Sequence, residues 1–143
     1  MKRWTRGFTL VEIMIVLVIL SLLLIISLPP YREQVQRTYR SLAKAELQKI
    51  VLRQEQFFTE ARAYAETLGE LGYPGDSYVL GKDGNIREGS VPGGIYRVSM
   101  APLGSSYRVQ AAPLQADSRC GNLSLDGLGT RQASGPDGVS GCW

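Results

Sequence analysis

Two features of this sequence are candidates for a functional role: a glutamate within an apolar segment, and a pair of cysteines near the C-terminus. Glu12 is the one charged residue in an apolar run from Phe8 to Leu28. A carboxylate in an apolar segment is costly, so it is a candidate functional group whose partner must be found. Cys120 and Cys142 lie near the C-terminus of the 143-residue chain. The sequence contains no histidine, the commonest general base and metal ligand.

No other set of residues indicates catalysis. The sequence has no glycine-rich nucleotide loop between a strand and a helix, and no cysteine in a catalytic context. Asp83, Asn85, Asp126 and Asp137 lie among glycines, but their spacing matches no EF-hand loop and is better explained by turns. We therefore expect that the protein is not an enzyme and that it has no cofactor or metal.

The apolar run is long enough to cross a membrane. As a helix, residues 8–28 would span about 31 Å, close to the thickness of the hydrocarbon layer. Lys2, Arg3 and Arg6 precede the run, which by the positive-inside rule places that end in the cytoplasm and the rest of the chain outside it. A secretory signal peptide fits less well, because the run is long and no small-residue cleavage site follows it. A plain signal anchor gives no reason for Glu12.

The expected export of the chain affects how we interpret the two cysteines and the net charge. In an oxidising compartment Cys120 and Cys142 most simply form one disulfide, and a reduced thiol pair is the alternative. The formal charge is +3 from 16 basic and 13 acidic side chains. Without the three basic residues at the start, 13 basic and 13 acidic side chains remain, so the net charge says little about partners.

A helical period continues beyond the apolar run, from Tyr31 to about Ala65. Pro29 and Pro30 lie just before it, and we expect them to kink or locally break the helix, because proline lacks the N–H and clashes with the preceding turn. Gln54 interrupts the apolar stripe of this segment. The stripe recurs at steps compatible with three or four residues, at Tyr39, Ala43, Leu47, Ile50, Phe57, Ala61 and Tyr64.

The second half of the chain has the pattern of turns and short strands. Residues 68–94 are rich in glycine and turn pairs, and they predict a loop with room for one short strand. Residues 95–101 and 106–112 alternate apolar and polar side chains around a hairpin turn at 103–105, and residues 122–126 offer a third strand. The predicted fold class is α+β: a long N-terminal helix, with a membrane half and an amphipathic half, packed on a small antiparallel sheet of three or four strands.

The run Arg6-Gly7-Phe8-Thr9-Leu10-Val11-Glu12 resembles the processing site of type IV pilins and pseudopilins. The resemblance implies that a prepilin peptidase cuts between Gly7 and Phe8 and methylates the new amine of Phe8. It also implies that Glu12 pairs with that amine on a neighbouring subunit, and that Pro29 is the proline common late in the family's apolar helix. Four segments follow: a cleaved leader (1–7), a transmembrane and assembly half-helix (8–30), an amphipathic half-helix (31–67) and a head (68–143).

The C-terminal part of the sequence resembles one group within this family. Residues 120–125, residues 128–131 and the final Cys142-Trp143 look like the PilE-type minor pilins, in which a disulfide loop closes near a final tryptophan. This implies a structural subunit that primes or joins the filament. The implied partners are other major and minor pilins, the prepilin peptidase and the inner-membrane assembly machinery. The implied location is the inner membrane and then the extracellular pilus. A DNA-binding or receptor-binding pilin and a type II secretion pseudopilin are the alternatives.

The alternative of a DNA-binding pilin requires basic side chains that can contact phosphates. We interpret those at the start of the outer helix as a solvated or intersubunit face, because this helix is largely packed inside a pilin filament; they are Arg32, Arg37, Arg40, Lys44, Lys49 and Arg53. On the head, Arg108, Arg119 and Arg131 are the candidate DNA contacts.

Overall fold

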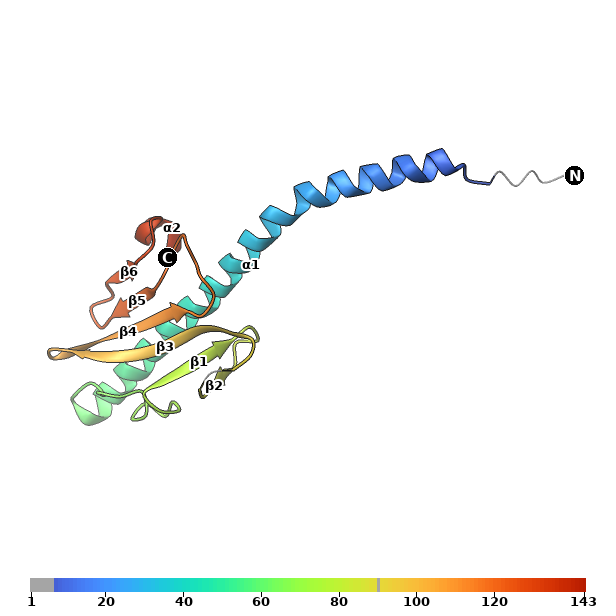
Figure 1. Ribbon diagram of the computed structural model, residues 1–143. Coiled ribbons are helices and arrows are strands. Elements are labelled where there is room, and N and C mark those ends of the chain that lie inside the picture. Colours follow the sequence, from blue (N-terminus) through green and yellow to red (C-terminus); the bar gives the residue numbers. More distant parts are fainter. Residues whose placement is uncertain (1–6, 90) are drawn as a thin grey trace, which may run out of the picture. The chain divides into compact units, whose positions relative to one another are not determined.

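The computed structural model describes residues 7–89 and 91–143. The chain divides into two units, Met1–Val35 and Gln36–Trp143. Helix α1 (Leu10–Ala61) runs through both units, and the second unit adds an antiparallel sheet and a short helix, α2 (Gly138–Cys142) (Figure 1). The predicted α+β fold with a long N-terminal helix is therefore confirmed.

Helix α1 continues through Pro29 and Pro30, so the break that we expected at this pair is wrong. The pair removes two backbone N–H donors, but helical turns continue on both sides of it. Apolar membrane helices tolerate proline in this way, because neighbouring groups satisfy the freed carbonyls. A kink at the pair stays a prediction.

The helix ends at Ala61, a few residues before the predicted end. Arg62 adopts a left-handed backbone with φ of 57°, and its N–H donates to the Phe58 carbonyl at 2.9 Å, as in helix caps that usually hold glycine. Gln54, which interrupts the apolar stripe, is fully buried. Its amide accepts from the Ala65 N–H and donates to the Ala65 carbonyl, both at 2.9 Å, and so holds the returning chain against α1.

The sheet has six strands in the described residues, where we expected three or four, in the order β2-β1-β3-β4-β5-β6. Neighbouring strands are antiparallel throughout. Residues 68–94 contain two strands, one more than predicted, because β1 has four consecutive buried residues and thus no alternation to detect. The strands are β1 (Ser77–Gly81), β2 (Ile86–Arg87), β3 (Gly94–Leu103), β4 (Ser106–Pro113), β5 (Leu123–Asp126) and β6 (Arg131–Ala133).

The core lies between α1 and one face of the sheet. Leu47 and Ile50 of α1 are fully buried, and each such side chain contributes roughly 1.5–3 kcal/mol by leaving water. Facing them are buried side chains from the sheet, including Tyr78, Tyr96, Val98, Tyr107, Val109 and Leu123. Because side chains alternate along a strand, the residues between these lie on the opposite face, which we call the outer face. Figure 1 views the sheet from this side, with α1 passing behind it.

Candidate functional site

The predicted cleavage site lies in a non-helical, exposed segment at residues 7–9. Phe8 is 78% exposed, and a Cβ built on Gly7 would have no neighbour within 4 Å. A peptidase would therefore meet no obstruction from this segment. Cleavage and methylation at Gly7 and Phe8 stay predictions, and the basic residues Lys2, Arg3 and Arg6 lie outside the described residues.

The side chain of Glu12 helps to cap the N-terminus of α1. The hydroxyl of Thr9 accepts from the Glu12 N–H at 3.2 Å, and the Glu12 carboxylate accepts from the Thr9 N–H at 3.5 Å. This reciprocal pair is a capping box, which satisfies N–H groups that a helix start leaves without partners. The sequence signal was present, since Thr-x-x-Glu before an apolar run is the signature of such a cap. Pairing of Glu12 with the Phe8 amine of another subunit stays a prediction.

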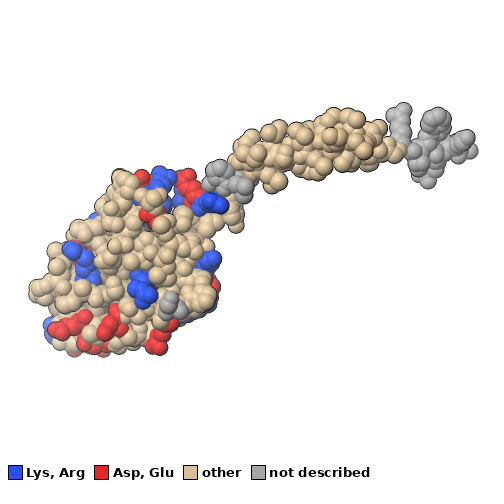
Figure 2. Space-filling view, viewed as in Figure 1, with Lys and Arg blue, Asp and Glu red and all other residues tan. Residues whose placement is uncertain are grey.

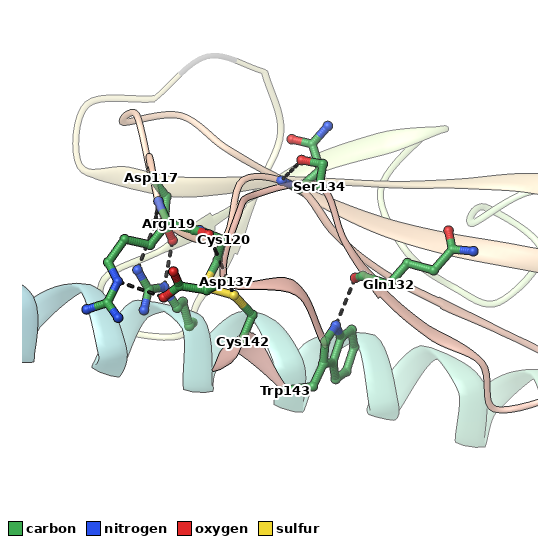
Figure 3. Close-up of a disulfide and its surroundings, with 10 residues drawn as sticks. Asp117, Arg119, Cys120, Gln132, Ser134, Asp137, Cys142 and Trp143 are labelled. Carbon is green, nitrogen blue, oxygen red and sulfur yellow. Dashed lines mark hydrogen bonds and ion pairs between the residues drawn. A yellow bond between two sulfur atoms is a disulfide. The ribbon is translucent and has the colours of Figure 1, made fainter. Parts of the chain in front are cut away.

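Cys120 and Cys142 form the predicted disulfide, at a sequence separation of 22 residues (Figure 3). The bond joins the end of α2 to the loop that precedes β5. Two further contacts hold the same ends: the Asp137 N–H donates to the Arg119 carbonyl at 3.1 Å, and the Arg119 side chain pairs with Asp137 at 2.7 Å. The disulfide loop, residues 120–142, is thus closed by covalent, backbone and charged contacts together.

The disulfide loop also depends on one glycine that sequence reasoning missed. A Cβ on Gly135 would overlap the backbone of Arg119 and Cys120, so only glycine fits this close approach. At the C-terminus, the Trp143 indole N–H donates to the Gln132 carbonyl of the edge strand β6 at 2.8 Å. The Arg131 guanidinium lies over the Trp143 ring, 5.7 Å from its centre.

A buried ion pair ties α1 to the start of the disulfide loop. Arg40 donates to Asp117 through Nε and Nη2, each at 2.7 Å, and the two side chains are 7% and 2% exposed. Asp117 also accepts from the backbone N–H groups of Arg119 at 3.3 Å and Cys120 at 3.2 Å. We had placed Arg40 on a solvated or intersubunit face, and its burial against Asp117 corrects that interpretation.

Burial by itself raises the pKa of Asp117. The hydrogen bond from Arg40 and those from the backbone N–H groups act against burial, and the resulting pKa lies below the ordinary value for aspartate. Asp117 is therefore an ionised carboxylate held in the interior by a cation and two N–H donors.

The other aspartates among the glycines serve turns and ion pairs. Asp83 accepts from the Asn85 N–H and pairs with Arg87 at 2.8 Å. Asp126 accepts from the N–H groups of Leu128 and Thr130 at 3.0 and 2.9 Å and so shapes the turn between β5 and β6. In the described part of the chain, no cluster of three or more ligand side chains could hold a metal ion.

The three arginines predicted as DNA contacts do not lie together. Arg108 lies on the outer face of β4, opposite Asp126 of β5. Arg131 is opposite Leu125 in the register of β5 and β6, so it lies on the face that α1 covers, and Arg119 pairs with Asp137. A fourth arginine, Arg97 of β3, shares the outer face with Arg108 and was not predicted.

The outer face has few charged side chains. Figure 2 views the head from the same side as Figure 1 and shows a mostly uncharged surface with separate basic patches, and acidic side chains gathered along its lower edge. Arg97 has no ion-pair partner among the described residues. Its strand neighbours on this face are neutral.

Comparisons with known proteins agree with these features. Residues 29–124 match the family described as "Type IV minor pilin ComP, DNA uptake sequence receptor". Residues 5–28 match the prokaryotic N-terminal methylation motif. The chain is 37% identical over 68 residues to the type IV major pilin protein PilA of Myxococcus xanthus (strain DK1622), a stretch that covers 48% of this chain and 31% of the relative. No solved structure matches the chain.

The family match extends over most of the chain, from the outer part of α1 into strand β5 of the head. The methylation motif covers the segment in which the cleavage site and the capping box lie. Helix α1 is also apolar and long enough to cross a membrane. The chain therefore belongs to the type IV minor pilin family of ComP.

Proposed function

We propose that the precursor is cut between Gly7 and Phe8 by a prepilin peptidase, which methylates the new amine. The mature chain is then held in the inner membrane by the first half of α1, with its N-terminus in the cytoplasm and its head in the periplasm. Support comes from the methylation motif at residues 5–28, from the exposed segment at residues 7–9 and from the apolar length of α1. The inner-membrane assembly machinery then moves the subunit into an extracellular filament.

We propose that Glu12 contributes to assembly with other major and minor pilins. Its carboxylate lies at the start of α1, beside the residues that precede the helix. After cleavage the Phe8 amine supplies a cation of opposite charge. An unpaired carboxylate is strongly unfavourable in an apolar setting. Pairing the Glu12 carboxylate with the Phe8 amine of a neighbouring subunit therefore stabilises the contact between the two subunits.

We propose further that the head binds double-stranded DNA on the outer face of the sheet. The observation that carries this proposal is Arg97, a cation on the outer face without an ion-pair partner among the described residues, with Arg108 on the adjacent strand. Cations free to contact phosphates supply the sequence-independent part of DNA affinity. The family description names a DNA uptake sequence receptor, which supports the same function.

Duplex DNA fits this face better than a single strand. Proteins that hold single strands stack bases on aromatic side chains. On β3 and β4 the aromatic residues Tyr96 and Tyr107 are buried against α1, each 1% exposed. Between Ile95 and Leu103 at the two ends of β3, the side chains on the outer face of β3 and β4 are arginine, serine, glutamine and alanine, which suit groove edges and phosphates.

The test is DNA binding by the mature chain in a neutral detergent, measured by fluorescence anisotropy with a labelled duplex between about 50 and 200 mM salt. We expect affinity to fall steeply with salt, and Arg97→Ala to reduce the slope of log affinity against log salt by about 1. Arg131→Ala is the matched control, because Arg131 lies on the other face of the sheet, and it should leave the slope unchanged. No binding at low salt, or equal effects of the two variants, would contradict the proposal.

A further inference from the structure

The strand register places a row of uncharged polar side chains across the outer face. In each antiparallel pair the partners lie directly opposite: Ser77 with Ser99, Ser99 with Gln110, Gln110 with Ser124, and Ser124 with Gln132. The row therefore crosses five strands, perpendicular to their direction. We call it the neutral row. It consists of Ser77, Ser99, Gln110, Ser124 and Gln132.

The neutral row is hollowed at the end that includes β5 and β6. A pocket of about 200 Å³ lies there, and its lining carries amide and hydroxyl groups but no charge: Gln110, Asn122, Ser124, Gln132, Ala133 and Ser134. The amide of Gln110 makes no hydrogen bond within the described part of the chain. In Figure 3 the amide of Gln132 points away from the Trp143 ring. Its oxygen accepts from the hydroxyl of Ser124 at 3.5 Å, and Ser124 is only 8% exposed, so Gln110 and Gln132 are the side chains of this end that a ligand can reach.

The two outer-face arginines lie on opposite sides of the neutral row. Arg97 is opposite Ala112, and Arg108 is opposite Ala101, so the two arginines are four residues apart along the strands and one strand apart across them. With about 3.4 Å per residue and about 4.8 Å between strands, their Cα atoms are about 14 Å apart. The major groove of B-DNA is about 12 Å wide, so the two cations can contact phosphates on either side of one groove.

The neutral row suits base edges rather than phosphates. Glutamine can bond to adenine through two atoms in the major groove, and serine can bond to any base. Gln110 and Gln132 are separated by one strand, so they lie about 9.6 Å apart, close to three base steps of about 3.4 Å.

We infer that the neutral row reads base edges along the major groove, with Gln110 and Gln132 as the specificity-determining residues, while Arg97 and Arg108 hold the flanking phosphates. This inference rests on the proposed binding of double-stranded DNA. Arg108 lies beside the Asp126 carboxylate, so Arg97 is the stronger phosphate contact of the two. Affinity and sequence preference then come from different side chains on the same face.

The experiment separates these two contributions. The mature chain in neutral detergent is used to select binders from a randomised duplex library, and the best sequence is compared with a scrambled duplex. We expect Gln110→Ala and Gln132→Ala to lower the preference for the selected sequence by about 10-fold each, with the salt slope unchanged. Arg97→Ala should weaken both duplexes equally and reduce the salt slope by about 1. Melting temperatures confirm that each variant is folded.

Two results would overturn the inference while leaving DNA binding intact: a wild-type chain that selects no sequence, or glutamine variants that keep the full preference. A chain that binds no duplex at all would remove the proposed function together with the inference. Competition by an uncharged polysaccharide such as dextran, independent of salt, would also overturn the inference, because the neutral row would then be a glycan site.

Discussion

The buried pair of Arg40 and Asp117 should contribute more to the stability of the head than any other charged contact that we describe. The change to make is Arg40→Met, which keeps the length and apolar stem of the side chain but removes the cation. It leaves Asp117 buried, with its carboxylate 2% exposed and without the two 2.7 Å hydrogen bonds from the guanidinium.

The expected loss follows from what remains around Asp117. Removing one partner of a buried ion pair costs about 3–5 kcal/mol. Asp117 keeps two backbone N–H donors, from Arg119 and Cys120, so we place the loss near the lower end, at about 3 kcal/mol. For a domain of this size that corresponds to a fall in melting temperature of roughly 12 °C or more.

The assay is urea unfolding of the full chain in detergent, followed by tryptophan fluorescence and near-UV circular dichroism, for the wild type and three variants. Lys44→Met is the control, because Lys44 lies one turn along α1 and has no ion-pair partner among the described residues; it should change stability by less than about 0.5 kcal/mol. Arg40→Met with Asp117→Leu should recover most of the loss, since removing both charges leaves neither one unpaired.

The pH dependence gives a second readout. Because the pKa of folded Asp117 lies below its unfolded value of about 3.9, its contribution is fully present above that value and is lost as pH falls through the folded pKa. The gap between wild type and Arg40→Met should therefore narrow below about pH 4. A loss under about 1 kcal/mol at neutral pH, or an equal loss in Lys44→Met, would refute the reasoning.

Three further outcomes are expected. Cys142→Ser should lower stability by about 3 kcal/mol, the chain-entropy value for a loop of 22 residues, and expose the segment after Gly121 to protease; an unchanged melting curve would contradict this. Glu12→Ala should be processed and inserted in the membrane but enter pili poorly, and normal incorporation measured by immunoblot of sheared filaments would exclude the pairing. Gly7→Val should accumulate as uncut precursor, because the added side chain meets nothing in this chain and must obstruct the peptidase; a mature N-terminus at Phe8 would show the assignment to be wrong.

Local patterns in the sequence determined a large part of this protein. The apolar run, the single glutamate within it and the alternation on either side of Gly104 depend on neighbours in the chain, so their periods can be recognised directly. The disulfide needed one more assumption, an oxidising compartment, and with two cysteines in the sequence the pairing left no alternative partner. The capping box was also present in the sequence at Thr9 and Glu12.

Contacts between distant residues could not be predicted in this way. Arg40 and Asp117 are 77 positions apart, and the pattern of α1 gave no sign that one of its basic side chains turns inward. Strand β1 shows no alternation because the four residues after Ser77 are all buried. Gln54 interrupts the apolar stripe in the sequence, and only the fold shows that its amide binds the backbone of Ala65.

The candidate DNA site also combines residues that the sequence reveals with an arrangement that only the fold determines. The sequence supplied arginines on the head, but it could not say which of them share a face of the sheet. A shift of one residue in strand pairing would move each side chain to the other face, so the neutral row and the two arginines beside it exist only in the observed register. Register is set by the packing of Val98, Val109 and Leu123 against α1, which is a property of the folded chain.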